Sequence, residues 1–514
     1  SISLFSAMSV KKKIAVNTIS NYTGYFIKLA VNFFLFPFVV HHLGAAQSGL
    51  WFLLSSITSY MGFLDVGIKP TLIKHVAHHH AKNNRQGINE VVNAAFFIYL
   101  IIGIAAALAM IVISYFFPQI FHIAPELIFK AKICTYIVAL ALFLSFPLSA
   151  IGAGTLNGLQ RYDKTRTSAV FSSLSGSLIV ILLLSKGYGV IAVTLADQTT
   201  NLLSWLLNVY FAKRIAPYLT ISLRFLKKAV IKEIFRFSVV IFVINMASRV
   251  IYYADRIVIG IFLNVSSIVF YEAAFKIYHT ITQIPLLLLS AIMPASSELS
   301  ARNRPSDLKK LYLYSTKYTI AFFLALVIPV LIFTRAILKI WVGPDYMSAA
   351  IYTQLFLLYV FFTLNHSSAV QILTGIGKVR TIMRYQVTVA IENLVLSIIL
   401  AKIFGLIGVI LGTTIPFIIM EWFYIKTTFK ILGVNWKEYL RKVILKPYLC
   451  AFLPAILLLI LHHFFDPARL WEIAAILVGG VILYALIFYF LGLSSEEKTE
   501  FKIIFKGKLL PKKN

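Results

Sequence analysis

Long apolar segments recur along the whole chain and constrain its fold more than any other feature. Runs of about 20 apolar residues follow one another, separated by glycine, proline or charged residues. A run of that length allows an α-helix to cross the hydrocarbon core of a bilayer, which is about 30 Å thick. Hydrophobic residues make up 60% of the 514 residues and charged residues only 13%, unlike a soluble domain. The pattern predicts an all-α polytopic membrane protein.

The spacing of the runs predicts about 14 transmembrane helices and leaves no room for a soluble domain. The predicted spans are 14–40, 47–66, 91–116, 131–156, 167–185, 189–211, 236–262, 268–294, 316–334, 351–374, 384–402, 405–426, 448–465 and 471–492. Two cysteines, Cys134 and Cys450, fall in separate apolar runs, so no disulfide framework is implied.

The positive charges alternate between the gaps. The chain carries 48 Lys and Arg against 19 Asp and Glu, a balance that would suit nucleic acid if the cations formed one soluble face. Instead they gather in every second gap and in both terminal segments, while the other gaps hold few. These few are Lys130, Lys132, Lys186, Arg335, Lys339, Lys402 and Arg469. Cationic loops stay on the cytoplasmic side, so both termini are predicted to be cytoplasmic and nucleic acid is excluded as a partner.

The sequence also repeats itself between its halves. Lys186-x-x-Gly189 recurs as Lys402-x-x-Gly405, and Leu43-Gly44 aligns with Leu263-Asn264, each time between two spans. Two repeats in the same orientation predict two six-helix lobes related by an axis along the membrane normal, with a substrate site between them. The predicted parts are an N-lobe at 14–211, a basic amphipathic linker at 212–235, a C-lobe at 236–426, two further helices within 448–492 and a basic tail at 493–514.

The linker 212–235 has two interpretations. Its amphipathic stretch would let it lie on the inner membrane surface as a connection between the lobes. An ordinary solvated basic loop accounts for the same composition. Both interpretations stay open at the level of sequence.

Ionisable residues inside apolar spans are costly, by about 3 kcal/mol each, and normally face a water-filled cavity or a partner. Three spans carry polar residues at helical spacing, which places each set on one face. The sets are Asn21, Tyr25, Lys28 and Asn32; Asp197, Asn201, Ser204 and Asn208; and Glu272, Lys276, His279 and Gln283. A fourth span holds Arg249 and Arg256 on one face with Tyr252 and Tyr253 between them, a set suited to an anionic, partly sugar-bearing ligand.

The intramembrane carboxylates allow a structural role as well. Glu272 and Lys276 are one helical turn apart and could neutralise each other. Asp255 could pair with Lys28 or Arg256 only to compensate a buried charge. Glu392 and Glu421 fit hydrogen bonding within one lobe at least as well as a ligand role.

Signals for metal binding and catalysis are weak. His75, His78 and His79 have helical spacing, yet they lie in a basic gap with no carboxylate before Glu90, so a solvated loop is favoured over a metal site. The chain has no phosphate-binding glycine loop, no H-E-x-x-H and no G-x-S-x-G elbow. We therefore predict a protein that is not an enzyme and has no cofactor.

Several motifs resemble one transporter family. Pro37, Leu43-Gly44, Gly49-Leu50-Trp51 and Leu64-Asp65-Val66-Gly67-Ile68 resemble the opening of bacterial polysaccharide-transport proteins in the multidrug/oligosaccharidyl-lipid/polysaccharide exporter superfamily. Ala254-Asp255-Arg256-Ile257-Val258-Ile259-Gly260, followed by Tyr271, resembles the seventh and eighth helices of the same family. Asp65 lies near the inner end of its helix, where a cap or gate is favoured over a ligand.

The resemblance implies a Wzx-type flippase, similar to the lipid II flippase, that carries an undecaprenyl-pyrophosphate-linked oligosaccharide across the bacterial inner membrane by alternating access. Its implied partners are that lipid-linked substrate, membrane lipids and polysaccharide polymerase machinery. The residues expected to bind the headgroup are Lys28, Arg249, Arg256, Lys276, Tyr25 and Tyr252. Asp197, Asp255 and Glu272 are expected to couple a proton or sodium ion.

Two alternatives stay open beside the flippase. A drug or cation exporter of the same superfamily would favour carboxylates over cations in its cavity. A membrane ligase, polymerase or acyltransferase would need a large outer catalytic loop, and the longest outer gaps here have roughly 15 residues with little catalytic chemistry.

Overall fold

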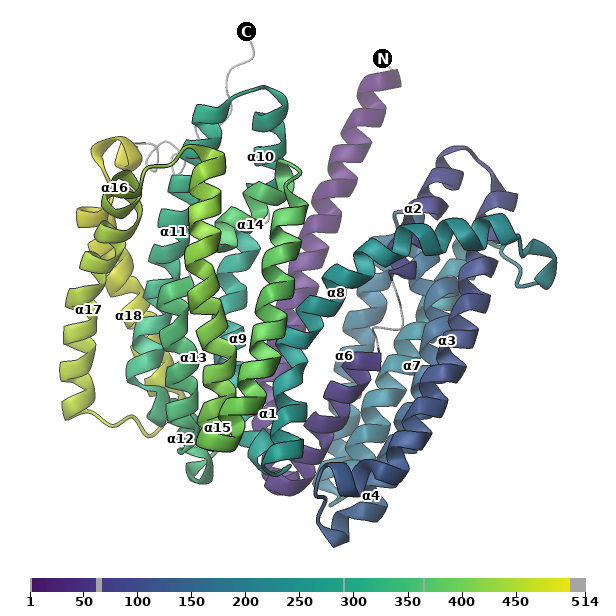
Figure 1. Ribbon diagram of the computed structural model, residues 1–514, viewed down its shortest axis with the longest axis horizontal. Helices are drawn as coiled ribbons and strands as arrows, with labels where there is room; N and C mark the ends of the chain where they lie inside the picture. Colours follow the sequence, from purple (N-terminus) through teal and green to yellow (C-terminus); the bar gives the residue numbers. More distant parts are fainter. Residues whose placement is uncertain (1, 62–66, 290–291, 364–365, 500–514) are drawn as a thin grey trace. The chain divides into compact units, whose positions relative to one another are not determined.

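The computed structural model describes residues 2–61, 67–289, 292–363 and 366–499 (Figure 1). Every regular element within these ranges is helical and none is a strand, which confirms the all-α prediction. Seven helices there are long and apolar enough to cross a membrane, or eight if a bent pair, α13 (Ala349–Thr363) with α14 (His366–Gly375), counts as one span. The protein is therefore a multi-pass membrane protein, and the number of 14 spans stays a prediction.

Two glycines break the longest helices between predicted spans. Helix α1 (Ile2–Met61) contains the first two spans and is interrupted at Gly44, whose φ of 69° is left-handed. Helix α15 (Val379–Leu432) contains two later spans and is interrupted at Gly405, with φ 59°. Glycine reaches such angles without steric cost, so each break falls inside a motif that the sequence repeat had singled out.

The chain forms two compact units. The first comprises Ser1–Val269 with Ala401–Val409, and the second comprises Phe270–Leu400 with Ile410–Asn514. This division differs from the predicted lobes, which change over in the linker before residue 236. The lobes were inferred from repeated motifs, whereas the units reflect packing, so the six-plus-six repeat stays a prediction.

The first unit is built on helices that follow one another in sequence. They are α1, α2 (Ile68–Ala81), α3 (Arg85–Ile120), α4 (Pro125–Ser149), a π-helical turn (Ala150–Gly154), α5 (Thr155–Gly158), α6 (Tyr162–Ser185), α7 (Val190–Ile215) and α8 (Lys228–Phe262). Val39 of α1, Val180 and Leu184 of α6, and Val193 and Ala196 of α7 form one buried apolar cluster. This cluster fixes α1, α6 and α7 around the cavity described below.

The predicted linker is docked on α3. Asn89 and Asn93 are one helical turn apart on α3 and buried. Asn89 accepts a hydrogen bond from the Thr220 backbone N–H at 3.0 Å and donates to the Tyr218 carbonyl at 3.1 Å. Asn93 accepts from the Ser222 N–H at 2.7 Å and donates to the Thr220 carbonyl at 2.8 Å. The stretch 218–222 is therefore held by side chains, unlike a freely solvated loop.

Substitution of Asn93 is expected to release this stretch. Asn93→Ala removes both of its hydrogen bonds to the linker and leaves backbone groups unpaired, which should destabilise the docked state by about 2 kcal/mol. Trypsin should then cut faster at Arg224 and Lys227, measured as a rate of cleavage of the folded protein in detergent. Gln119→Ala, exposed near the end of α3 away from these contacts, is the control and should leave the rate unchanged. Equal rates for Asn93→Ala and the unaltered protein would contradict the docking.

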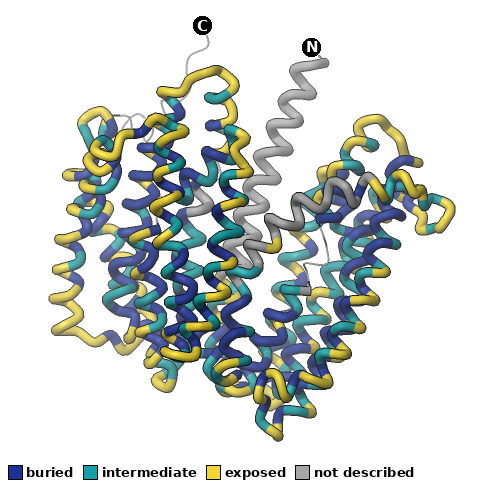
Figure 2. The backbone as a smooth tube through the Cα atoms, in the orientation of Figure 1, coloured by how far each residue is buried: buried dark blue, intermediate teal, exposed yellow. Residues whose placement is uncertain are grey.

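The second unit holds the remaining helices. They are α9 (Ser267–Leu288), α10 (Ile292–Ala301), α11 (Pro305–Ile332), α12 (Thr334–Trp341), α13, α14, most of α15, α16 (Trp436–Tyr439), α17 (Leu445–Phe464) and α18 (Leu470–Ile487). Phe356 of α13 packs between Tyr271 and Tyr278 of α9, with ring centroids 5.6 and 5.3 Å away. Exposed residues recur along α17 (Figure 2), and many are leucine or phenylalanine, as expected of a helix facing lipid.

Candidate functional site

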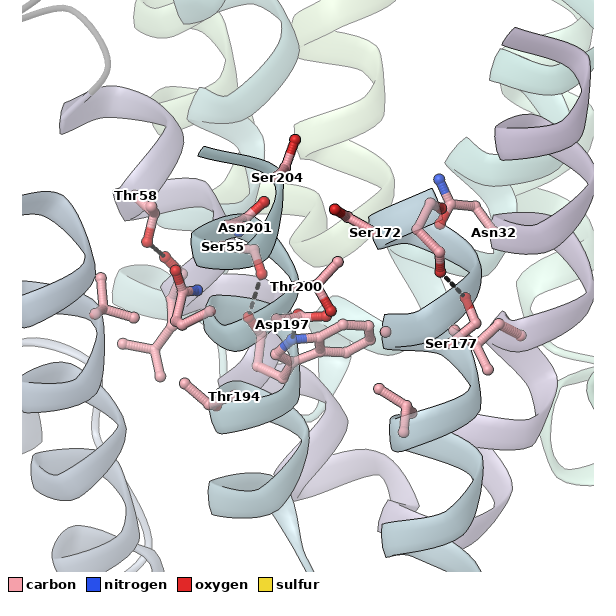
Figure 3. Close-up of a pocket in the computed structure, with 18 of the residues that line it drawn as sticks. Asn32, Ser55, Thr58, Ser172, Ser177, Thr194, Asp197, Thr200, Asn201 and Ser204 are labelled. Atoms are coloured by element: carbon pink, nitrogen blue, oxygen red, sulfur yellow. Dashed lines mark hydrogen bonds between the residues drawn. The ribbon is translucent and has the colours of Figure 1, made fainter. Parts of the chain in front are cut away.

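A polar cavity of about 530 Å³ lies inside the first unit among α1, α6 and α7. Its walls are mainly hydroxyl and amide side chains, although the helices that form it are apolar overall (Figure 3). Its polar lining residues are Asn32, Trp51, Ser55, Thr58, Ser172, Ser173, Ser177, Thr194, Asp197, Gln198, Thr200, Asn201 and Ser204. Such a lining can solvate an ion or bind sugar hydroxyl groups.

Asp197 on α7 is the only carboxylate among the described residues that line this cavity. The indole Nε1–H of Trp51 donates a hydrogen bond of 2.7 Å to its Oδ2. The bond joins α1 to α7 at the wall of the cavity. Trp51 follows the Gly44 break, and the break therefore directs the second half of α1 toward α7.

The cavity wall depends on close packing of α6 against α7. A Cβ atom at Gly176 would lie 1.8 Å from Oγ1 of Thr200, closer than any real contact. Ser172, Ser173 and Ser177 surround this glycine on α6. Small residues let two membrane helices approach closely, and their hydroxyl groups supply the polar surface.

The structure brings together three of the four residues in the predicted stripe on α7. Asp197, Asn201 and Ser204 all line the cavity. Asn208 does not line it. Asn208 is buried one turn further along α7, where it packs closely against Gly152. From the predicted stripe on α1, Asn32 lines the cavity. The side chains of Asn21, Tyr25 and Lys28 lie outside the described residues.

A second charged group is buried in the first unit. Asp255 and Arg256 of α8 are 0% and 7% exposed. The Arg256 guanidinium lies 5.5 Å from the centroid of the Tyr253 ring, and Tyr60 of α1 is close enough to interact electrostatically with both charged residues. The structure therefore brings Asp255, Arg256 and Tyr60 together. The side chains of Arg249 and Tyr252 lie outside the described residues.

The predicted stripe on α9 belongs to the second unit. Glu272 is buried, and Lys276 and His279 are half-buried. The His279 ring stacks on Phe275 with centroids 5.7 Å apart. The aromatic contacts with α13 therefore cover one side of α9 and fix the orientation of this stripe.

Sequence reasoning had considered a hydrogen bond within one lobe for Glu421 but had not identified its partner, His366. His366 Nδ1 lies 3.1 Å from Oε2 of Glu421, and Glu421 is 3% exposed. The other oxygen of Glu421 and the hydroxyl groups of Tyr385 and Tyr424 are buried without a hydrogen-bond partner within the described residues. His366 is far from Glu421 in sequence and lies in an unremarkable apolar run, so no local signal pointed to the pair.

His75, His78 and His79 lie in helix α2, where His78 is exposed and His79 packs within the first unit. A Cβ at Gly87 would lie 2.3 Å from Nδ1 of His79, so this ring rests on the first turn of α3. Within the part of the chain that the structure describes, no three His, Cys, Asp or Glu side chains are arranged to hold a metal ion.

The sequence matches a family of known proteins over more than half of its length. Residues 49–351 match the model of the polysaccharide biosynthesis protein family. The chain belongs to this family. The match includes nearly the whole lining of the α1–α6–α7 cavity and the buried Asp255–Arg256 group.

Relatives of this polysaccharide biosynthesis protein are distant in sequence but similar in length. The chain is 20% identical to the uncharacterised membrane protein EpsK of Bacillus subtilis, covering 79% of this chain and 81% of EpsK. It is 22% identical to a proposed O-antigen transporter of Shigella flexneri, covering 79% of this chain and 97% of the relative.

Solved structures share its fold. The inward closed structure of the lipid II flippase MurJ covers 92% of this polysaccharide biosynthesis protein, with a TM-score of 0.70 and 16% identity, and is itself covered to 99%. An inward-facing multidrug transporter of the MOP superfamily covers 80% of the chain, with a TM-score of 0.65 and 18% identity, and is itself covered to 94%. At such low identity these similarities establish the fold alone, which this chain shares with the two transporters.

Proposed function

We propose that this protein is a flippase for an undecaprenyl-pyrophosphate-linked oligosaccharide. The cargo would be the repeat unit of an O-antigen or another surface polysaccharide, moved from the inner to the outer leaflet of the bacterial cytoplasmic membrane. The family match over residues 49–351 is the observation that most supports this proposal. The fold shared with the lipid II flippase supports it further, since both cargoes are glycans on a polyprenyl carrier.

The proposed headgroup site uses the cations that lie inside the apolar spans. Lys28, Arg249, Arg256 and Lys276, with Tyr25 and Tyr252, would bind pyrophosphate and sugar in a cavity between the lobes while the prenyl chain stays in lipid. Arginine suits this role because its guanidinium binds phosphate oxygens in a bidentate manner. Arg256 is a buried intramembrane cation, and such residues usually face a partner or a ligand.

The proposed cycle alternates between inward-open and outward-open states and is coupled to an ion or to the membrane potential. Asp197, Asp255 and Glu272 are the candidates for binding a proton or sodium ion. Asp197 has the best support, because it is the one carboxylate lining the α1–α6–α7 cavity. No covalent step is part of this proposal, so the protein would act as a transporter and not as an enzyme. Both termini would be cytoplasmic. The proposed partner, polysaccharide polymerase machinery, would receive the cargo only after it has been flipped.

Removal of two intramembrane cations tests the headgroup assignment. In a bacterial strain lacking its own oligosaccharide flippase, Lys28→Ala with Arg249→Ala should lower surface polysaccharide by roughly 30-fold, as expected when charges that bind a buried anion are lost. Surface polysaccharide is measured by gel and normalised to membrane abundance. Lys186→Ala with Lys402→Ala removes two exposed cations from the predicted outer gaps and should retain activity. Full activity of the first double variant at normal abundance would rule out the assigned site.

A drug or cation exporter is the second candidate, and one observation favours it. Among the described residues that line the cavity in the first unit, one is a carboxylate and none is a cation, which suits a positively charged cargo. An exporter would lower the sensitivity of a host strain to cationic drugs without restoring surface polysaccharide. The flippase proposal predicts the reverse pair of results, so both measurements on one strain distinguish the two functions.

Asp197 should be needed for turnover more than for folding. Asp197→Asn keeps the size of the side chain and a hydrogen-bond acceptor for Trp51 but removes the charge. We expect transport to fall by roughly tenfold or more, the size of a typical coupling free energy. The pH dependence of transport, measured in vesicles with an imposed proton or sodium gradient, should disappear with it. Asp163→Asn, in an exposed ion pair with Arg161, is the matched control. A variant that still responds to the gradient would contradict the coupling role.

A further inference from the structure

A second cavity, of about 650 Å³, lies within the second unit and is strongly cationic. Three segments far apart in sequence form it: the start of α11, the stretch from α16 to the start of α17, and the stretch that follows α18. The charge pattern of the sequence predicts all three to be cytoplasmic. The structure therefore gathers three predicted cytoplasmic segments around one opening, which we call the basic pocket.

The basic pocket has more cations than its own carboxylates neutralise. Its charged lining consists of Lys309, Lys310, Lys317, Arg441, Lys442 and Lys446 against Glu438, Glu496 and Glu497. The Glu438 carboxylate forms ion pairs with the ammonium groups of Lys309, at 2.6 Å, and Lys442, at 3.0 Å. Lys310, Arg441 and Lys446 form no ion pair within the described residues. Six cations against three carboxylates, Glu496 included, leave the pocket with an excess of positive charge, an arrangement that attracts a phosphate group.

A buried ion pair forms one part of the pocket wall. Lys317, 5% exposed, donates to both oxygens of Glu497 at 2.7 and 2.8 Å. Glu497 also accepts the Ser494 backbone N–H at 2.7 Å and the Tyr318 hydroxyl at 3.1 Å. Lys317 pairs with both oxygens of Glu497, so we assign it a structural role in the wall of the pocket. Lys310, Arg441 and Lys446 are the cations that could bind a ligand.

Apolar surface continues from the pocket along α17. Leu445, Leu449 and Phe452 are 53%, 63% and 71% exposed, and they follow Arg441 at helical spacing. Exposed residues along this helix are visible in Figure 2. A cationic pocket at the predicted inner surface, continuous with a lipid-facing helix, matches a molecule that has an anionic head and acyl chains. A free phosphate ion would make no use of the apolar face.

We propose that the basic pocket binds the phosphate headgroup of an anionic phospholipid of the inner leaflet. Lys310, Arg441 and Lys446 would contact the phosphate oxygens, and the acyl chains would lie along α17. This site is distinct from the proposed headgroup site for the transported glycolipid, since none of the residues assigned to that site lines the basic pocket. The proposal does not depend on the transport activity.

The test uses the purified full-length protein in detergent, titrated with phosphatidylglycerol, phosphatidylcholine or inorganic phosphate and followed by native mass spectrometry. The unaltered protein should retain phosphatidylglycerol in preference to phosphatidylcholine. The triple variant Lys310→Gln, Arg441→Gln, Lys446→Gln should bind phosphatidylglycerol at least roughly tenfold more weakly. Lys378→Gln, Arg380→Gln, Arg384→Gln removes three exposed cations from another predicted cytoplasmic segment of the same unit and should bind normally.

Three results would overturn the proposal. Equal losses in the two triple variants would mean that lipid binds to general surface charge. Inorganic phosphate that displaces phosphatidylglycerol at matched concentration would mean that the apolar face plays no part. Normal binding by the pocket variant would remove the assigned cations from the site. Lys310→Arg, Arg441→Lys, Lys446→Arg keeps the charges and should restore binding, which separates a charge effect from a folding defect.

Discussion

Valine in place of Gly49 is expected to destabilise the first unit by at least about 3 kcal/mol, the upper end of the cost of overpacking. A Cβ atom at this position would lie 1.9 Å from the backbone oxygen of Val265 and 2.7 Å from its carbonyl carbon. Side chains can rotate away from such a conflict, but backbone atoms cannot. Helix α1 and the connection between α8 and α9 would have to separate, and the buried surface around Leu50 and Leu53 would open with them.

Thermal unfolding in detergent, followed by intrinsic fluorescence or by loss of the monodisperse peak, measures this effect. Gly479→Val is the control, because a Cβ at that position meets no heavy atom within 4 Å. Gly49→Val should unfold at a much lower temperature, or fail to accumulate in the membrane, while Gly479→Val behaves like the unaltered protein. Similar melting of the two variants would contradict the close approach at Val265.

Lys317→Met should be the most damaging substitution in the second unit. It leaves Glu497 buried, 5% exposed, without its principal partner, and breaking a buried pair from one side typically costs about 3–5 kcal/mol. Lys339→Met breaks the pair between Lys339 and Asp466, which has the same chemistry at 3.1 Å but is exposed. An exposed pair is worth at most about 1 kcal/mol, so the control should change little.

A double-mutant cycle and a pH titration sharpen this test. Lys317→Met with Glu497→Leu removes both charges, so it should cost less than Lys317→Met alone. Burial tends to raise the pKa of Glu497, but hydrogen bonds from Lys317 and Ser494 outweigh it and lower the pKa below its ordinary value. The stabilisation is therefore present above the ordinary pKa and is lost as the pH falls through the lowered one, below roughly pH 4. Additive single effects, or an unchanged acid profile in Lys317→Met, would contradict the buried pair.

The helices were predictable because their signal is local. Each predicted span overlaps a helix of the described structure, since a run of about 20 apolar residues has few other stable forms in a membrane. The breaks at Gly44 and Gly405 fall where the sequence repeat had placed a boundary. The polar stripe on α7 could be found for the same reason, because Asp197, Asn201 and Ser204 are related by helical periodicity alone.

The contacts that join helices were not predictable, because their partners are distant in sequence. Trp51 and Asp197 are 146 residues apart, and neither position indicates the other. Lys317 was counted with the cytoplasmic cations because it begins a span, whereas its side chain is buried against Glu497, 180 residues away. Asn89 and Asn93 resembled ordinary helix residues until the backbone of 218–222 was placed beside them. Charge and periodicity describe a helix, but only the packed structure identifies its neighbours.

The short segment Ala401–Val409, which packs with the first unit, has a consequence for how the protein is made. Synthesis proceeds from the N-terminus, so the ribosome completes residues 1–269 well before this segment emerges. Until then the first unit lacks the contact in which Lys402 lies 5.2 Å from the Phe262 ring. Its assembly in the membrane therefore ends late, after most of the second unit has been inserted, and a nascent chain released early would carry an unfinished surface at the end of α8.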